Sequence, residues 1–240
     1  MIRPDARQLA GVLEATWPPA TRREAGGWII REGRGGGQRV SAATLAAPEL
    51  ADIAFAERAM RALGQQPLFM VKEDETVLDR ALAARGYALA DPTLFYLCPI
   101  GALTGEPVPP MTAFAIWPPL AICRDIWRAG GIGAERIAVM RRVAGPATAL
   151  LARANDRPAG AAFVAVARKT AMIHALEIAP TQRRQGVGIN MLRAAAHWAQ
   201  GHGAAWFSLA VTAANVPANA LYCKAGLKVA GRYHYRKMRQ

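Results

Sequence analysis

Residues 182–188, Gln-Arg-Arg-Gln-Gly-Val-Gly, have the types and spacing of an anion-binding turn. Glycine lets a backbone approach a phosphate closely. The free N–H groups in the first turn of a helix, aided by the helix dipole, bind anions. Arg183 and Arg184 add positive charge and hydrogen-bond donors. A strand-like apolar run, 171–178, precedes the turn and a helix-like run, 189–199, follows it, so the order strand, turn, helix predicts a phosphate site.

Two common nucleotide motifs do not fit this turn. The stretch has no Gly-Lys-Ser/Thr ending, which excludes a P-loop for ATP or GTP. It has two glycines and no third, and no acidic residue follows about 20 positions later, so it is a poor dinucleotide fingerprint. The turn instead resembles the acyl-CoA loop of the GNAT N-acetyltransferases, whose pattern Gln/Arg-x-x-Gly-x-Gly/Ala is filled by Arg183, Gly186 and Gly188.

The segment 215–227 strengthens this resemblance. GNAT proteins carry Asn-x-x-Ala-x-x-Leu-Tyr-x-x-x-Gly-Phe here, and the chain departs from it only at Leu227. Residues 176–180 also resemble the family's end-of-strand segment, and the whole resemblance spans roughly 147–236. It implies that acetyl-CoA is the co-substrate and that the acetyl group moves to a primary amine by direct attack in a ternary complex. The implied cofactor-binding residues are Leu176, Ile178, Arg183, Arg184, Gln185, Gly186, Val187, Gly188 and Asn215.

Two residues are candidates for catalysis. Tyr222 matches the family's general acid for the departing CoA thiolate, and a phenol with a pKa near 10 is protonated at neutral pH. The alternative is a packed aromatic residue with a satisfied hydroxyl group. Glu177, the only acidic residue after Asp156, is a candidate general base. Its alternatives are an anion that binds the amine without proton transfer, or a structural partner of an arginine.

Strand alternation predicts which of these side chains share a face. Leu176 and Ile178 are expected on one face of the sheet and Glu177 on the other. His174, two residues before Leu176, is expected on the face of Leu176. A core histidine is the simpler interpretation of His174, and a second base is the alternative.

The net charge of +13 is concentrated in one half of the chain. Residues 1–120 hold 12 Lys/Arg and 13 Asp/Glu, whereas residues 121–240 hold 18 and 4. A polyanion such as coenzyme A would therefore bind the second half. Nucleic acid is an alternative ligand, and a solvated arginine-rich surface is another explanation. Aromatic and basic residues alternate near the C-terminus, as in single-strand platforms, but no RNA-recognition motif is present, so nucleic acid is an unlikely partner.

Simple counts predict the location, and the resemblance to GNAT proteins implies the broad class of function. No apolar run reaches the ~20 residues of a membrane span, and the first residues lack the apolar core of a secretory signal. Three widely spaced cysteines, Cys98, Cys123 and Cys223, favour reduced thiols. We expect a cytoplasmic acyltransferase with no membrane partner and no metal, because the histidines lack metal-ligand spacing. A non-catalytic acyl-CoA-binding module is the main alternative, and a basic nucleic-acid-binding protein is less favoured.

The second half predicts a mixed, mostly antiparallel sheet flanked by helices, an α/β fold. The turn at 155–158 is expected to join two strands as a hairpin. The expected strands are 112–117, 147–154, 159–168, 170–178, 204–211 and 227–235, and the expected helices are 119–129, 134–143, 187–200 and 216–225.

The first half echoes this plan. Residues 81–90 align with 221–230 when Gly86 is placed on Gly226, which indicates two copies of one unit. Leu82 then stands in place of Tyr222, and 41–49, the expected cofactor loop, has no glycine. Helices are expected at 5–15, 51–63 and 77–85, and strands at 28–31, 39–43, 68–71 and 87–97.

This echo and the resemblance to tandem GNAT proteins together imply three parts of the chain. They are a degenerate GNAT-like lobe at 1–98 that does not bind acyl-CoA, a Pro- and Gly-rich linker at 99–110, and an acetyl-CoA-binding catalytic lobe at 111–240. The glycine run 33–37, with Arg34 and Arg39, could cradle an anion. Its place between two expected strands favours a flexible hairpin tip that borders the substrate cleft.

Overall fold

One eight-stranded mixed sheet connects the N- and C-terminal parts of the protein. The computed structural model describes residues 2–238. The strand order is β4-β11-β5-β10-β9-β8-β7-β6, and β9 and β10 are the only parallel neighbours among the described residues. These strands are β4 (Leu68–Lys72), β5 (Tyr87–Pro99), β6 (Ala113–Ile116), β7 (Ala147–Ala154), β8 (Arg157–Ala167), β9 (Thr170–Ile178), β10 (Trp206–Thr212) and β11 (Lys228–Met238).

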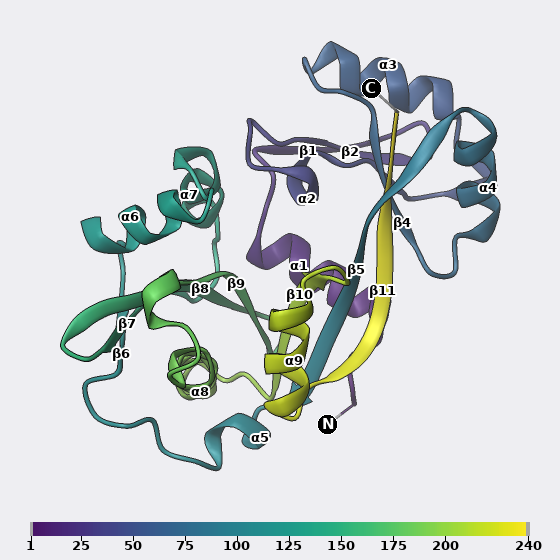
Figure 1. Ribbon diagram of the computed structural model, residues 1–240. Coiled ribbons are helices and arrows are strands. Elements are labelled where there is room, and N and C mark those ends of the chain that lie inside the picture. The colour runs from purple at the N-terminus through teal and green to yellow at the C-terminus, as the bar shows by residue number, and fades with distance from the viewer. Residues whose placement is uncertain (1, 239–240) are drawn as a thin grey trace.

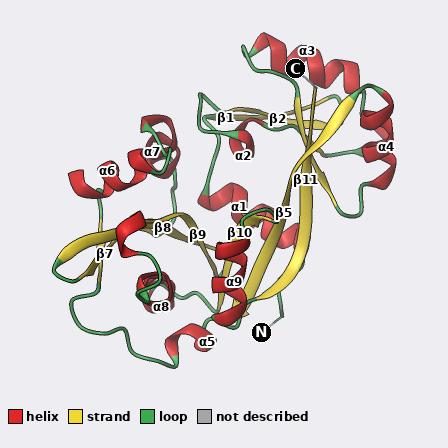
Figure 2. Ribbon diagram, in the orientation of Figure 1, coloured by secondary structure: helices red, strands yellow, loops and turns green. Residues whose placement is uncertain are grey.

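A smaller sheet and the helices complete the fold (Figure 2). The smaller, antiparallel sheet consists of β1 (Thr21–Ala25), β2 (Trp28–Glu32) and β3 (Thr44–Leu45). The α-helices are α1 (Ala6–Thr16), α2 (Gln38–Ser41), α3 (Ile53–Ala62), α4 (Thr76–Ala84), α5 (Gly101–Thr104), α6 (Ala121–Ala129), α7 (Ala134–Arg141), α8 (Val187–Gly201) and α9 (Val216–Lys224). Two 3₁₀ turns, η1 (Pro48–Leu50) and η2 (Pro180–Gln182), precede α3 and α8.

Tight turns with positive φ angles form the hairpins of both sheets. Asn155 and Asp156 (φ 51° and 56°) join β7 to β8, and Arg168 and Lys169 (φ 50° and 60°) join β8 to β9. Two-residue loops in which both residues have positive φ match the right-handed twist of the flanking strands. The hairpin predicted at 155–158 is therefore confirmed, and the β7–β8–β9 meander that carries the candidate site follows from local turn chemistry.

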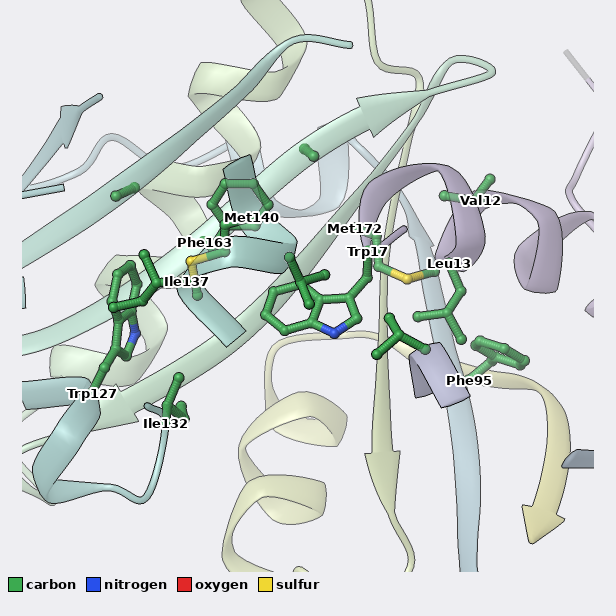
Figure 3. Close-up of a cluster of buried hydrophobic side chains, with 14 of the residues drawn as sticks. Val12, Leu13, Trp17, Phe95, Trp127, Ile132, Ile137, Met140, Phe163 and Met172 are labelled. Carbon is green, nitrogen blue, oxygen red and sulfur yellow. The ribbon is translucent and has the colours of Figure 1, made fainter. Parts of the chain in front are cut away.

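The large sheet is covered by different helices on its two faces. Alternation along β8 sends Phe163 and Ala165 to one face, with α1, α6 and α7, and Ala162 and Val164 to the other, with α8 and α9. Figure 3 shows the first of these clusters, in which Trp17 lies at the end of α1. The rings of Trp17 and Phe163 meet edge to face with centroids 6.1 Å apart. A helix near the N-terminus thus packs on strands from the C-terminal part.

The pairing of β5 with β11 has an internal two-fold pseudo-symmetry. In the alignment that places Gly86 on Gly226, Thr93 falls on Tyr233, and these two residues are partners in the sheet. In the same alignment, Val71 falls on Val211 and Leu94 falls on His234. The Val71–His234 pair of β4 and β11 therefore corresponds to the Val211–Leu94 pair of β10 and β5. Each half of the chain therefore contributes one long strand to the sheet of the other. Figure 1 shows β5 and β11 side by side between the two groups of helices.

Most predicted elements of the chain are confirmed, including strands 147–154 and 170–178 at their predicted bounds. Two predictions in the N-terminal part are wrong. Residues 39–43 were expected to be a strand, but Gln38–Ser41 form the short helix α2. The glycine run 33–37 lies between β2 and α2, so it is not a hairpin tip. The hairpin lies earlier in the chain, where Gly26 and Gly27 (φ 58° and 78°) join β1 to β2.

Candidate active site

The predicted anion-binding turn leads into α8 with an uncapped N-terminus. Gly186 is the N-cap residue, has φ 80°, and supplies no side-chain cap. No atom lies within 4 Å of the position that a Cβ atom would take on Gly186, so the space above the turn is open. The first N–H groups of a helix have no acceptor within it, and in the described structure no backbone carbonyl accepts from those of Val187 or Gly188. This end of α8 can bind an anion.

Gly188 has a different role from that of Gly186. A Cβ atom on Gly188 would lie 2.8 Å from Cδ2 of Leu221 and 3.2 Å from Cδ1 of Ile178. Glycine at this position therefore lets α8 pack closely against α9 and the end of β9. The two glycines of the motif therefore have different roles. Gly186 leaves space above the turn, and Gly188 allows α8, α9 and the end of β9 to pack closely.

The side chains of the turn are held by neighbouring groups. Arg183 donates from Nε to the carbonyl oxygen of Ile178 (3.1 Å) and from Nη2 to Oε1 of Glu177 (3.2 Å). Gln185 accepts at Oε1 from Nδ2 of Asn155 (2.8 Å). Arg184 is exposed and has φ 64°. Of the two predicted arginines, Arg184 faces solvent, whereas Arg183 ties the turn to the end of β9.

A cavity opens where β9 and β10 separate. Their parallel pairing runs from Thr170–Trp206 to Ile173–Leu209. Just beyond it lies a cavity of about 500 Å³. Three of the predicted site residues line this cavity: Leu176 from β9, Asn215 at the N-cap of α9, and Tyr222 from α9. The structure therefore brings together the strand end and the Asn-to-Tyr segment that the sequence resemblance selected.

Tyr222 is suited to donate a proton. Its ring lies against that of Tyr96, with centroids 5.8 Å apart, and the residue is 6% exposed. Burial raises the pKa of Tyr222 to about 12, although the positive charge of Arg39 opposes this rise. The phenol is therefore fully protonated at neutral pH. Asn215, in contrast, has a local structural task, because its side chain accepts a hydrogen bond from the N–H of Ala218 (3.2 Å) and caps α9.

A bulge at Ala175 changes the predicted faces of β9. Ala175 has φ 51°, and the β8–β9 register shifts between the Phe163–His174 and Ala161–Glu177 pairs. His174 consequently packs with Trp17 and Phe163, on the face opposite Leu176. The prediction that His174 shares the face of Leu176 is wrong, because the bulge adds a residue that alternation does not count.

His174 is neutral and its tautomer is defined by a neighbour. The hydroxyl of Thr16 donates to the carbonyl oxygen of Val12 (2.8 Å), so Nε2 of His174 donates to Oγ1 of Thr16 (2.9 Å). Nδ1 is then an acceptor, and it is buried with no hydrogen-bond partner among the described residues. Burial, and then the positive charge of Arg39, lower the pKa of His174 well below its usual value.

Glu177 lies apart from the residues that line the cavity. Its carboxylate receives a hydrogen bond from Arg183 (3.2 Å) and is covered by the end of α6. A Cβ atom on Gly130 would lie 2.6 Å from Cδ of Glu177. Glycine at position 130 therefore allows the carboxylate to fit beneath the α6–α7 connection. The structure places Glu177 on the face of β9 that carries His174. Tyr222 packs on the opposite face of the sheet and lines the cavity, whereas Glu177 does not line it.

Several lining residues come from the N-terminal part and were not predicted as site residues. They include Trp17, Gly36, Gly37, Gln38, Arg39 and Asp91. The glycine run thus borders the cavity, as expected, although not as a hairpin tip. A Cβ atom on Gly36 would lie 2.6 Å from Val139, so glycine lets this segment pack closely against α7. Only the isolated Arg39 beside a glycine run hinted at this contact in the sequence.

Two further observations concern ligands and membranes. Among residues 2–238, no group of three or more His, Cys, Asp or Glu side chains is placed to hold a metal ion. None of the helices within the same range combines the length and apolar character that crossing a bilayer requires.

Fold and site together define an α/β protein with a glycine turn beside a parallel strand pair that separates. Residues 121–227 match the model of the acetyltransferase (GNAT) family. This segment therefore matches a GNAT acetyltransferase domain, and acyl transfer is the chemistry of that family. A comparison with curated protein sequences gives no match.

Solved structures share the fold over nearly the full chain. A GCN5-related N-acetyltransferase from Kribbella flavida is 19% identical, with a TM-score of 0.69 over 98% of this chain and 96% of its own. A functionally unknown conserved protein from Staphylococcus epidermidis is 13% identical, with a TM-score of 0.68 over 93% and 96%. A tandem GNAT protein from the clavulanic acid biosynthesis pathway is 14% identical, with a TM-score of 0.62 over 95% and 86%. At these identities the likeness concerns the fold.

Proposed function

We propose that the protein is an N-acetyltransferase that moves an acetyl group from acetyl-CoA to a primary amine by direct attack in a ternary complex. The observation that supports this most strongly is the cavity at the β9–β10 separation, which a protonated Tyr222 lines together with Leu176, near the end of the strand that leads into the glycine turn and the uncapped N-terminus of α8. A phosphate group of the co-substrate would be held by N–H groups at the turn. The strand edge at 174–178 would hold the arm that carries the thioester.

The residues fit this polyanionic co-substrate by shape and charge. The space above Gly186 is open, and Arg184 is exposed beside it. Val187 and Gly188 are buried beneath the turn and support its backbone, while Gln185 and Arg183 brace it from both sides. Leu176 and Ile178 pack against the α8–α9 core and give the end of β9 an apolar face.

The chemical roles follow from the protonation states of the side chains. The amine must be neutral to attack the thioester carbonyl, after which the C–N bond forms and the C–S bond breaks. Tyr222 donates its proton to the departing thiolate. Glu177 accepts the proton of the amine through water, since its carboxylate is held by Arg183 outside the cavity lining. N–H groups near the end of β9 polarise the thioester carbonyl.

The N-terminal segment (residues 1–98) is proposed as a silent copy that shapes the acceptor side of the cavity. It supplies Trp17, Arg39 and Asp91 to the lining. The deciding experiment is calorimetric titration of the purified protein with acetyl-CoA, with dephospho-CoA as the control for the 3′-phosphate. We expect saturable binding at one site per chain. Two sites would refute the silent copy, and no binding would refute the acetyltransferase.

A further inference from the structure

Arg39 is a partly buried cation without an acidic partner. It belongs to α2, in the N-terminal segment, and reaches the cavity of the C-terminal part. Its Nη2 atom donates to the carbonyl oxygen of Ala210 on β10 (2.7 Å). In the described part of the chain, the ion pairs within 4.0 Å do not include Arg39. A guanidinium group has five N–H donors in a planar fork, so most of its donors remain available.

Orphaned polar atoms lie on the residues around Arg39. The hydroxyl of Tyr235 and Nδ1 of His174 are buried without hydrogen-bond partners among the described residues, and both residues line the cavity. Buried polar groups in proteins almost always have partners. Their grouping with an unpaired guanidinium indicates that a polar ligand completes this part of the cavity.

The charge of the cavity favours an anion. Its one acidic lining residue is Asp91, which is exposed and accepts a hydrogen bond from Nε2 of Gln38 (2.9 Å). Arg136, also exposed, is the second arginine in the lining. Two arginines against one aspartate leave the cavity positive, and Arg39 is the more buried of the two cations.

A neighbouring cavity gives the contrast. A cavity of about 550 Å³ in the N-terminal segment shares Trp17 and Arg39 with the first one, so Arg39 stands where the two meet. Other cations of that second cavity are paired, as in Arg31–Glu14 (2.9 Å) and Lys72–Glu75 (2.8 Å). Arg39 is therefore distinguished among these cations by having no carboxylate.

We propose that the acceptor amine carries a carboxylate group, which Arg39 binds, and that the acceptor is therefore an amino acid. This inference rests on the proposed acetyltransferase function. The planar fork of arginine matches a carboxylate with two parallel hydrogen bonds. Arg39 lines the same cavity as His174 and the proposed acid Tyr222. A short spacing between amino and carboxylate groups, as in α- or β-amino acids, suits this arrangement.

The test compares amines that differ only at the carboxyl group. CoA release from acetyl-CoA is measured with the twenty α-amino acids and β-alanine, each beside its own carboxamide. The amine of a carboxamide is the less basic, so a larger share of it is neutral and the comparison is biased against the proposal. We expect kcat/KM for the best amino acid to exceed that of its carboxamide by about 100-fold. Equal values, or acetyl-CoA binding with no carboxylated amine acetylated, would overturn the proposal.

Variants separate a carboxylate site from other roles of Arg39. Arg39→Met should raise KM for the amino acid by about 100-fold and remove the preference over the carboxamide. Arg34→Met, at an exposed position in the glycine run just before α2, is the matched control and should change neither. A loss of kcat with unchanged KM for every acceptor would place Arg39 at the thioester and overturn the proposal.

Folding and the co-substrate provide the remaining controls. The Kd for acetyl-CoA and the Tm of the Met variant should match those of the wild type. If Arg39→Met does not fold, Arg39→Lys tests the same point, because it keeps the charge and loses the planar fork. It should raise KM for the amino acid by about tenfold, and an unchanged KM would overturn the proposal. Absent acetyl-CoA binding in the wild type would instead refute the underlying acetyltransferase function.

Discussion

The protein contains two cavities that each lie beside a parallel backbone pairing, and they differ in the groups that would hold a phosphate. In the C-terminal part, β9 and β10 pair in parallel and then separate. In the N-terminal part, Ala43 and Phe69 form a parallel bridge, and a cavity of about 550 Å³ opens beside it. The helix after the first of these cavities is α8, and the helix after the second is α3.

The two cavities differ in how the N-terminus of the following helix is capped. Gly186 leaves the first turn of α8 uncapped. The equivalent turn before α3 has no glycine between 46 and 52, and the side chain of Asp52 accepts a hydrogen bond from the N–H of Ala54 (2.9 Å). The negatively charged carboxylate of Asp52 thus occupies the N-terminus of α3, where a phosphate would otherwise bind, and it would repel a phosphate.

The same contrast holds along α4 and α9. In the alignment that places Gly86 on Gly226, Glu75 corresponds to Asn215. The carboxylate of Glu75 forms an ion pair with Nζ of Lys72 (2.8 Å). Leu82, fully buried, stands where Tyr222 stands. The N-terminal part therefore lacks a counterpart of Tyr222 as well as a glycine turn, which agrees with its proposed silence.

The largest effect should come from separating the two halves. Residues 111–240 expressed alone should not fold, because β5 lies between β10 and β11 and β11 also pairs with β4. Co-expression with residues 1–110 should restore the sheet. Circular dichroism melting and gel filtration would measure this. A cooperative transition from the C-terminal fragment alone would show that the exchanged strands are dispensable.

Gly186→Glu should weaken acetyl-CoA binding by at least about 100-fold, since a carboxylate would enter the space above the turn and repel phosphate. Gly203→Glu is the matched control, because Gly203 also has φ 80° and no atom within 4 Å of its Cβ position, but lies beyond the opposite end of α8. Calorimetry would give both dissociation constants. Equal affinities for the two variants would remove the turn from the site.

Tyr222→Phe should lower kcat by about 100-fold while the Kd for acetyl-CoA stays nearly constant, since the acid is lost and the packing is kept. Tyr87→Phe, a buried tyrosine of the N-terminal part, should leave kcat unchanged. With a pKa of about 12, Tyr222 should also produce no fall in kcat between pH 7 and 10. Unchanged turnover of Tyr222→Phe would exclude it as the acid.

Glu177→Gln should lower kcat/KM by about tenfold, less than the loss at Tyr222, because solvent can accept the amine proton in its place. The exposed Glu106, changed to Gln, is the control. Steady-state kinetics of CoA release would compare the two variants. Wild-type kinetics for Glu177→Gln would leave Glu177 only its ion pair with Arg183.

The sequence predicted best where structure depends on local chemistry. The β7–β9 meander follows from apolar runs joined by turn residues, and α8 from a glycine turn before a helical run. Strand β1 was missed because four of its five residues are polar and exposed, so they show no alternation. Helix α2, with four residues, is too short for a helical period. The bulge at Ala175 and the position of Arg39, bonded to Ala210, depend on tertiary packing that no local pattern encodes.

The smallest effect concerns Asp79, the counterpart of Asn219 in the same alignment. Hydrogen bonds from Arg236 (2.7 Å) lower the pKa of the Asp79 carboxyl to about 2. Asn219 instead accepts from the hydroxyl of Tyr96 (3.0 Å). Because the pKa in the folded state lies below the ordinary 3.8, the stabilisation is complete above about pH 4 and is lost as the pH falls towards 2.

Asp79→Asn should therefore lower the free energy of unfolding at pH 7 by about 1.5 kcal/mol, a value reduced for the partial exposure of the side chain. The variant should also lose less stability than the wild type between pH 4 and pH 2, because it has no carboxylate to protonate. Urea unfolding at several pH values would measure both effects, with the fully exposed Asp156→Asn as the control. A constant difference between variant and wild type across this range would show that the pair adds no pH-dependent stability. The exchanged strand β11 would then be held to the N-terminal part by packing and backbone hydrogen bonds, as β5 is to the C-terminal part.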